Sequence, residues 1–237
     1  MNIADLIYPK KCLQCDISGG YLCSECLKKV GPAKLFCLEC LKPSIDGATH
    51  VRCKKPLSID FAHSPWRYEG VIRGAILKLK YSFASDVADE LSEAFCQKLK
   101  ADVFILPKDV VICPIPLHRL RQNWRGFNQS QELAKAVAKQ LAWEYYPDLL
   151  IRKKFSKPQV ELRGKQRKEN VLGAFALSSS FKSPVMGSSR SENPSGRRHK
   201  SFVIFDDVLT TGSTIREAAK VLKRAGARTV WGLTIAA

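Results

Sequence analysis

Apolar runs and helical spacing near the end of the chain predict a strand, a helix and a second strand. The run 202–205 is wholly apolar, as expected for a central parallel strand that is buried on both faces. Residues 215–224 have the spacing of an amphipathic helix, and Gly226 ends it before another strand over 229–235. The helix is expected to bury Ile215, Ala218, Ala219 and Leu222. This order predicts a parallel βαβ unit.

A similar pattern occurs near the middle of the chain. The apolar run 110–113 predicts another strand, and residues 130–141 have the spacing of an amphipathic helix. The positions that this helix is expected to bury are Leu133, Ala134, Val137, Ala138 and Leu141. Strands and helices that alternate over 61–177 and 202–237 predict an α/β fold with a parallel sheet.

The patterning divides the chain into parts. Residues 1–57 are rich in cysteine and have few long apolar runs, so we expect a small domain there. Residues 61–237 hold the α/β pattern and form the predicted second domain. Within them, residues 178–201 are rich in Ser, Pro, Gly and Arg and have no periodicity, which predicts a mobile insertion loop.

Composition and charge add a class of partner to this picture. The 237 residues are 45% hydrophobic, which is enough for a folded core, and the net charge is +17. About 12 of these charges lie between residues 114 and 201. The excess predicts a polyanionic partner such as nucleic acid, a phosphate-rich metabolite or anionic lipid. Charge alone does not choose among them.

The apolar runs also bear on location. None approaches the ~18 residues that a membrane-spanning helix needs, so we expect no membrane insertion. Residues 1–11 have no segment of the kind that is cleaved on export. We therefore expect a cytoplasmic protein.

Seven of the nine cysteines lie in the first 53 residues, where they form pairs with two intervening residues. A histidine and a cysteine form a fourth pair of this spacing. The eight residues are Cys12, Cys15, Cys23, Cys26, Cys37, Cys40, His50 and Cys53. Because this spacing lets both side chains of a pair share one tetrahedral ion, four pairs predict two closed structural zinc sites.

Two groupings of these ligands are open. Sequential grouping assigns the ligands within 12–26 to one ion and those within 37–53 to the other, whereas interleaved grouping mixes them. A disulfide or redox framework is the alternative chemistry, and it needs an oxidising compartment. A segment this short cannot build an adequate apolar core, so metal would stabilise its fold.

The predicted strand 202–205 runs into two carboxylates and a loop rich in hydroxyl groups. Backbone N–H groups around Gly212, at the start of the predicted helix, would form a cradle for phosphate. The carboxylates of Asp206 and Asp207 suit sugar hydroxyls or hydrated Mg²⁺. Further donors are the hydroxyls of Thr210, Thr211, Ser213 and Thr214. The loop thus predicts a site for a phosphorylated pentose, and ordinary capping of the helix is the alternative.

A basic loop follows the predicted strand 110–113. Ligands of parallel sheets bind at the carboxyl ends of the strands, so we expect its arginines to face the same cleft as Asp206. They are Arg119, Arg121 and Arg125. A charged turn exposed to solvent is the alternative, but Gly126 and Phe127 favour a shaped loop.

The segment FDDVLTTGST at 205–214 resembles the 5-phosphoribosyl-1-pyrophosphate (PRPP) signature of type I phosphoribosyltransferases. Over essentially the whole chain, the order of motifs resembles the ComF family of competence-associated phosphoribosyltransferase-like proteins. These motifs are the cysteine pairs, YEG at 68–70, LKLKY at 77–81, PIPLHRLRQNWRGFNQ at 114–129, KPQ at 157–159 and FDDVLTTGST. The resemblance implies a double zinc ribbon followed by a type I phosphoribosyltransferase-like parallel sheet flanked by helices.

The resemblance also implies roles for the site residues. Residues 210–214 would hold the 5-phosphate of PRPP, which binds with Mg²⁺. Asp206 and Asp207, the expected catalytic pair, would hold the ribose diol and stabilise an oxocarbenium-like state. The cations expected around the pyrophosphate are Arg119, Arg121 and Arg125, with Lys165, Arg167 and Lys168 from a mobile segment.

Three functions remain open on these grounds. The first is a PRPP-binding protein that acts in natural transformation and handles incoming single-stranded DNA in the cytosol, together with proteins of the competence machinery. The second is an active glycosyltransferase of nucleotide metabolism or salvage with an unknown acceptor. The third is a single-stranded nucleic-acid-binding module with a vestigial PRPP pocket. We favour the first and third acting together.

Overall fold

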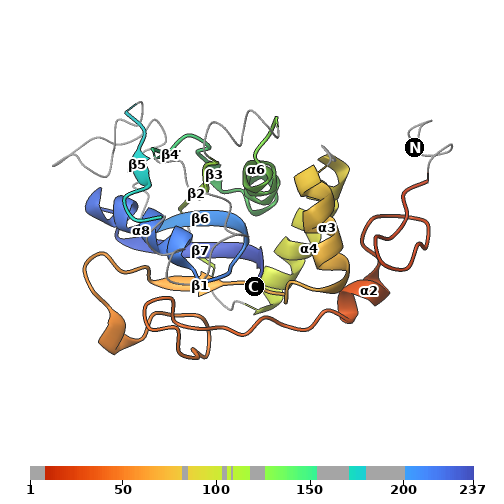
Figure 1. The fold of residues 1–237 in the computed structure, drawn as a ribbon, viewed down its shortest axis with the longest axis horizontal. Helices are drawn as coiled ribbons and strands as arrows, with labels where there is room; N and C mark the ends of the chain where they lie inside the picture. Colours follow the sequence, from red (N-terminus) through yellow and green to blue (C-terminus); the bar gives the residue numbers. More distant parts are fainter. Residues whose placement is uncertain are drawn as a thin grey trace.

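A computed structural model describes residues 9–81, 85–102, 106–107, 109–117, 126–153, 171–179 and 201–237. Five strands in this part of the chain form one sheet in the order β1-β7-β6-β2-β3 (Figure 1). They are β1 (Phe61–His63), β2 (Val110–Pro114), β3 (Glu144–Tyr145), β6 (Ser201–Val208) and β7 (Thr229–Ala236). Every neighbouring pair runs parallel, which confirms the predicted parallel sheet.

Strand β6 lies in the middle of the sheet and pairs with β2 and β7. Its residues 202–205 are buried, as predicted. The strand is longer than predicted, because its pairing with β7 continues through both aspartates to Val208. On its other edge, β2 ends at Pro114, opposite Phe205. The acidic pair therefore lies beyond the end of β2, in the part of β6 that no longer pairs with β2.

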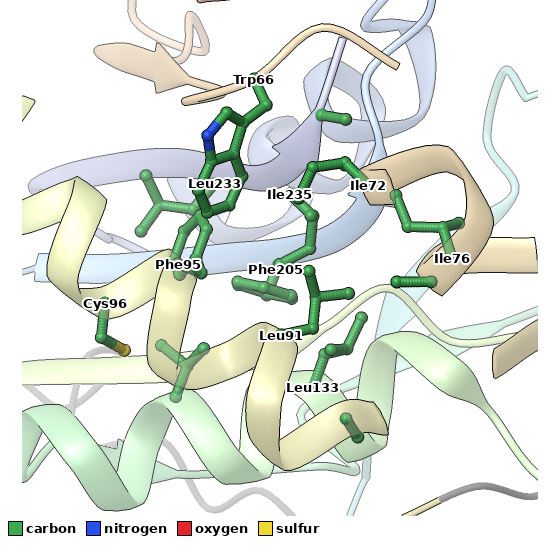
Figure 2. Packing of buried hydrophobic residues seen from close by; sticks show 14 of the residues in the cluster. Trp66, Ile72, Ile76, Leu91, Phe95, Cys96, Leu133, Phe205, Leu233 and Ile235 are labelled. Carbon is green, nitrogen blue, oxygen red and sulfur yellow. The ribbon is translucent and has the colours of Figure 1, made fainter. Parts of the chain in front are cut away.

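Three helices cover one face of the sheet (Figure 1). They are α3 (Gly70–Tyr81), α4 (Ser85–Asp102) and α6 (Gln129–Leu141). Figure 2 shows their packing, in which Phe95 of α4 meets Phe205 of β6 edge to face with 5.5 Å between ring centroids. Around them lie Ile72 and Ile76 of α3, Leu91 of α4, Leu133 of α6, and Leu233 and Ile235 of β7. This packing holds α3 and α6 against β6, the strand that carries the acidic pair.

The other face is covered by α8 (Ser213–Arg224) and by the antiparallel pair β4 (Leu150–Arg152) and β5 (Phe175–Leu177). The predicted apolar side of α8 is confirmed, because all four of its members are buried. The helix begins at Ser213, two residues earlier than predicted. It lies so close to β7 that a Cβ atom at Gly232 would be 2.6 Å from Ile215 Cγ2.

Helix α6 begins at Gln129, one residue before its predicted start. Asn128 caps it, since its Oδ1 accepts a hydrogen bond from the Ser130 N–H at 3.1 Å. The Asn128 side-chain amide also donates to the carbonyl of Ile115 at 3.0 Å. Four of the five predicted buried positions are buried, whereas Leu141, in the last turn, is half-buried. The cap ties the start of α6 to the segment that follows β2.

The cysteine-rich segment lies along the α/β part of the chain. Its regular elements among residues 9–57 are α2 (Ser24–Lys28) and the 3-10 turn η1 (Val51–Cys53). Near α2 (red in Figure 1), it packs beside α3, and Glu90 of α4 accepts hydrogen bonds from the N–H groups of Tyr21 and Leu22 at 2.6 and 3.2 Å. Leu38 joins the core on the α8 side. The domain boundary between residues 57 and 61 stays a prediction.

The predicted insertion loop 178–201 lies outside the described residues except at its edges. At one edge, the Ser178 N–H donates to the carbonyl of Leu149 at 3.0 Å, and at the other Ser201 begins β6. In the part of the chain that the structure describes, no helix is both long and apolar enough to cross a membrane.

Candidate functional site

The helices that follow β2 and β6 lie on opposite faces of the sheet. Helix α6 packs in the layer with α3 and α4, whereas α8 packs in the layer with β4 and β5. Parallel α/β sheets bind ligands in the crevice beyond the carboxyl ends of the strands where such a reversal occurs. Here the reversal falls between β2 and β6, so the candidate site is the end of β6 with Asp206 and Asp207.

Both carboxylates of this acidic pair have partners on other elements. The hydroxyl of Ser130, in the first turn of α6, donates to Asp206 Oδ1 at 2.8 Å. Lys80 Nζ, in the last turn of α3, lies 2.7 Å from Asp207 Oδ2. Gln129 Nε2 donates to the same oxygen at 3.4 Å. Side chains of α3 and α6 thus converge on the end of β6.

Burial and mutual repulsion set the charge of the acidic pair. Burial, followed by the neighbouring charge of Asp207, raises the pKa of Asp206 to about 7, while the Ser130 hydrogen bond and Lys80 act in the opposite direction. Burial lowers the pKa of Lys80, but the nearby carboxylates, above all Asp207, raise it overall. The site therefore combines a lysine whose pKa is raised with an aspartate, Asp206, whose pKa is raised to about 7.

The loop 209–214 leads from β6 into α8 through a turn at Gly212. The φ angle of Gly212 is +66°, a left-handed conformation that favours glycine, and this residue is the N-cap of α8. The N–H groups at the start of α8 point towards the positive end of the helix dipole. Thr210 is exposed, Thr211 and Thr214 are half-buried, and Gly212 and Ser213 are buried. The residues predicted to bind phosphate thus lie in the segment that joins β6 to the first turn of α8, and their binding of phosphate stays a prediction.

The six predicted cations of the basic loop and the mobile segment lie outside the described residues. They are Arg119, Arg121, Arg125, Lys165, Arg167 and Lys168. Their proposed contacts with pyrophosphate stay predictions. In the described part of the site, Lys80 supplies the cation beside the acidic pair.

The sequence pattern did not assign Lys80, Gln129 or Ser130 to the site. Each contacts an aspartate from a distant part of the chain, and the two α6 contacts span 78 and 76 positions. The sequence could have indicated Gln129 and Ser130. Polar residues at the start of a helix that follows a strand lie near the ligand crevice of a parallel sheet. Lys80 carried no such signal beyond its place in the LKLKY segment.

The eight predicted metal ligands form two groups. The first group is Cys12, Cys15, Cys23 and Cys26, and the second group is Cys37, Cys40, His50 and Cys53. Within each group the ligand atoms all lie within 4.8 Å of one another. This is the sequential grouping. No disulfide joins any of the nine cysteines, all of which lie in the described residues.

Distances within both groups fit tetrahedral coordination. The Sγ atoms of Cys15 and Cys23 are 3.6 Å apart, close to the ~3.8 Å that separates two sulfur ligands of one zinc ion at about 2.3 Å bond length. In the second group, Cys40 Sγ lies 3.4 Å from His50 Nδ1. His50 Nε2 lies 3.1 Å from the carbonyl of Pro43, to which it can donate its proton, leaving the Nδ1 lone pair for an ion.

Backbone N–H groups favour one thiolate in each group. Burial opposes the charged form, but N–H groups of neighbouring residues outweigh it and lower the pKa of Cys12 to about 6. The pKa of Cys37 is lowered below its ordinary value by the same balance. Thiolates are the form in which cysteine binds metals. Both groups could therefore hold a zinc ion.

The comparison with protein families defines the class of the α/β part. The phosphoribosyl transferase domain family matches residues 128–236. This range begins at the cap of α6 and includes β6, the acidic pair, the loop 209–214, α8 and β7. The α/β part therefore contains a phosphoribosyltransferase domain, which confirms the predicted fold class.

Comparison with individual proteins covers nearly the whole chain. It is 30% identical over 220 residues to "DNA utilization protein YhgH" of Shigella flexneri and of Escherichia coli strain K12, covering 88% of this chain and 87% of each relative. It is 28% identical over 216 residues to "Competence protein F" of Haemophilus influenzae, covering 89% and 83%. The chain belongs to the ComF family of competence-associated phosphoribosyltransferase-like proteins.

The metal groups give a first prediction. We expect the purified protein to hold about two zinc ions per chain, because each closed group supplies four ligands. His50→Ala should hold about one after brief dialysis against EDTA, as measured by plasma mass spectrometry. Cys96→Ala is the control, because this buried thiol on α4 belongs to neither group, and it should keep both ions. Two ions retained in the His50→Ala protein would contradict ligation by His50.

The acidic pair gives a second prediction. Asp207→Asn should lower the pKa of Asp206 from about 7, because it removes a neighbouring negative charge. Lys80→Met should raise the same pKa, because it removes the cation. Carboxyl carbon shifts in a ¹³C NMR titration report both changes. Asp86→Asn, on the exposed side of α4, is the control and should leave the titration unchanged. Shifts of the opposite sign would show that the two aspartates are not electrostatically coupled as described.

Proposed function

We propose that this protein binds PRPP with Mg²⁺ at the end of β6 and handles single-stranded DNA that enters the cytosol during natural transformation. The proposed PRPP binding rests mainly on the junction of β6 and α8. There, two carboxylates lie beside a loop that turns through Gly212 at a helix N-terminus. A phosphorylated sugar presents hydroxyls and a phosphate that match these two kinds of group.

In this proposal each part of the site meets a different part of PRPP. N–H and hydroxyl groups of residues 210–214 donate to the 5-phosphate, as an anion at a helix N-terminus requires. The ribose hydroxyls donate to Asp206 and Asp207. Lys80 keeps its charge and balances the carboxylates. Mg²⁺ would supply charge neutralisation for the pyrophosphate, with Arg119, Arg121 or Arg125 in the basic loop.

Transfer chemistry is a second candidate, and the same residues support it. The anomeric C–O bond would break with its electron pair leaving on pyrophosphate, and a nitrogen nucleophile would form the new bond at that carbon. The carboxylates of Asp206 and Asp207 would stabilise the positive charge that develops on the sugar ring. Lys165, Arg167 or Lys168 would close over the leaving group. The acceptor is unassigned.

The DNA half of the proposal is supported by charge and by relatives. The basic excess lies mainly between residues 114 and 201, which precede the acidic pair in the sequence. Proteins that cover most of this chain carry the names "DNA utilization protein YhgH" and "Competence protein F". A single strand offers a continuous row of phosphates to such a surface. Partners in the competence machinery would deliver that strand.

Binding of PRPP is tested by a third prediction. Titration calorimetry with PRPP and Mg²⁺ should give an affinity for the wild type that falls at least about 100-fold, or about 2.7 kcal/mol, in the double variant Asp206→Ala, Asp207→Ala. The double variant Asp86→Ala, Asp89→Ala changes the net charge equally on the exposed side of α4 and should bind as the wild type does. Equal affinity of the wild type and the Asp206→Ala, Asp207→Ala protein would overturn the assignment.

Binding of DNA is tested by a fourth prediction. The affinity for a fluorescent oligothymidine should fall about 20-fold between 50 and 200 mM salt if about three phosphates are neutralised. The triple variant Arg119→Ala, Arg121→Ala, Arg125→Ala should flatten this slope. The triple variant Lys28→Ala, Lys29→Ala, Lys34→Ala removes the same charge from exposed positions in the cysteine-rich segment and should keep it. An affinity that does not depend on salt would argue against the proposed binding of single-stranded DNA.

A further inference from the structure

The second metal group touches the loop 209–214 through one side chain. Leu38 lies between the ligands Cys37 and Cys40, and its exposed fraction is 1%. A Cβ atom at Gly212 would lie 2.5 Å from Leu38 Cδ2 and 3.3 Å from Cδ1. The backbone of the loop at Gly212 therefore rests directly on the leucine. A larger residue at position 212 would displace either the loop backbone or the Leu38 side chain.

A hydrogen bond joins the same two parts at a second point. The Arg216 side chain, in the first turn of α8, donates through Nη1 to the carbonyl of Leu38 at 2.7 Å. The Arg216 N–H in turn bonds to the carbonyl of Gly212 at 2.9 Å. Leu38 thus contacts two neighbouring parts of the chain. Its side chain packs against the turn before α8, and its carbonyl accepts a hydrogen bond from the first turn of α8. Phosphate-binding N–H groups would come from this short stretch.

Leu38 lies in a short turn between two of the metal ligands, Cys37 and Cys40. The turn that carries it is closed by backbone hydrogen bonds from Leu41 N–H to the carbonyl of Cys37 at 2.8 Å and from Cys37 N–H to the carbonyl of Lys42 at 2.9 Å. In the described structure, residues 32–60 contain no helix longer than the three-residue η1. Four ligands that share one ion would hold this turn more firmly than those few bonds do.

The first group has a different neighbourhood. Leu13 Cβ lies 3.4 Å from a Cβ atom placed at Gly74, and Gln14 Oε1 lies 3.0 Å from one at Gly70. Both glycines belong to α3, and Cys12 and Cys26 join the core on that face. The two groups therefore pack against opposite layers of the domain. The first group packs on the α3 side, and Leu38 joins the second group to the loop on the α8 side.

We propose that the metal of the second group positions the phosphate loop through Leu38 and Arg216, so that PRPP affinity depends on zinc occupancy at that group. Loss of this ion frees Leu38, and Gly212 and the first turn of α8 lose the surface on which they rest. The PRPP part of this inference rests on the proposed function. The mechanical part, the control of loop 209–214 by the metal, does not.

Two variants, each lacking one cysteine ligand, test the inference. Cys40→Ser removes a ligand from the second group, and Cys15→Ser removes one from the first. Hydrogen exchange of the amides in 209–216, followed by mass spectrometry, should rise about tenfold in Cys40→Ser and stay within about twofold of the wild type in Cys15→Ser. PRPP–Mg²⁺ affinity should fall by a similar factor in Cys40→Ser alone. Equal exchange in the two variants overturns the inference.

A second pair of variants keeps the test valid if Cys40→Ser fails to fold. Leu38→Ala leaves every metal ligand in place, so it should keep both zinc ions while exchange in 209–216 rises. Leu38→Met restores a large apolar side chain and should restore slow exchange. Slow exchange in Leu38→Ala would overturn the inference. If the wild type does not bind PRPP, the proposed function fails, whereas the exchange data still decide whether the metal positions the loop.

Discussion

Two adjacent carboxylates at the end of a largely buried strand are the constraint on which the rest of the site depends. Partly desolvated negative charges are costly unless hydrogen bonds or a cation compensate them. The compensation comes from both neighbouring helices of one layer, through Ser130 and Gln129 at the start of α6 and Lys80 at the end of α3. The packing around Phe95 and Phe205 (Figure 2) therefore also fixes the electrostatics of the site.

Strand β6 extends beyond its neighbour β2 at the position of the acidic pair. Strand β2 ends in Pro114, which has no N–H to donate, and the last hydrogen bond described from its end to β6 runs from the Ile115 N–H to the carbonyl of Phe205 at 2.8 Å. Strand β7 continues beside β6 as far as Ala236. The acidic pair is therefore paired with β7 on one edge of β6, whereas the pairing of β6 with β2 stops at Phe205. The carboxyl end of a strand, just past the end of its neighbour, is where parallel α/β sheets bind their ligands.

The sequence predicted the parts of this arrangement that depend on local pattern. Apolar runs and helical spacing identified β2, β6, β7, α6 and α8, and the acidic residues with Gly212 marked the loop. The end of β6 was wrong by three residues, because pairing with β7 extends the strand through polar positions that have no apolar pattern. Lys80 and Leu38 were missed for a related reason. Their partners, Asp207 and Gly212, are distant in the chain and are brought close only by packing.

The cysteine-rich segment gains a different meaning from its charge and its contacts. Residues 1–60 carry nine basic and six acidic side chains, and seven thiolates with two Zn²⁺ would make the segment nearly neutral. A neutral segment is a poor electrostatic surface for DNA, however much its paired cysteines resemble those of DNA-binding zinc modules. Its contacts include α3, α4, the turn before α8 and the first turn of that helix. These contacts agree with the proposal that each metal group supports one layer of the domain, and with the proposal that a polyanion would meet the basic residues between 114 and 201.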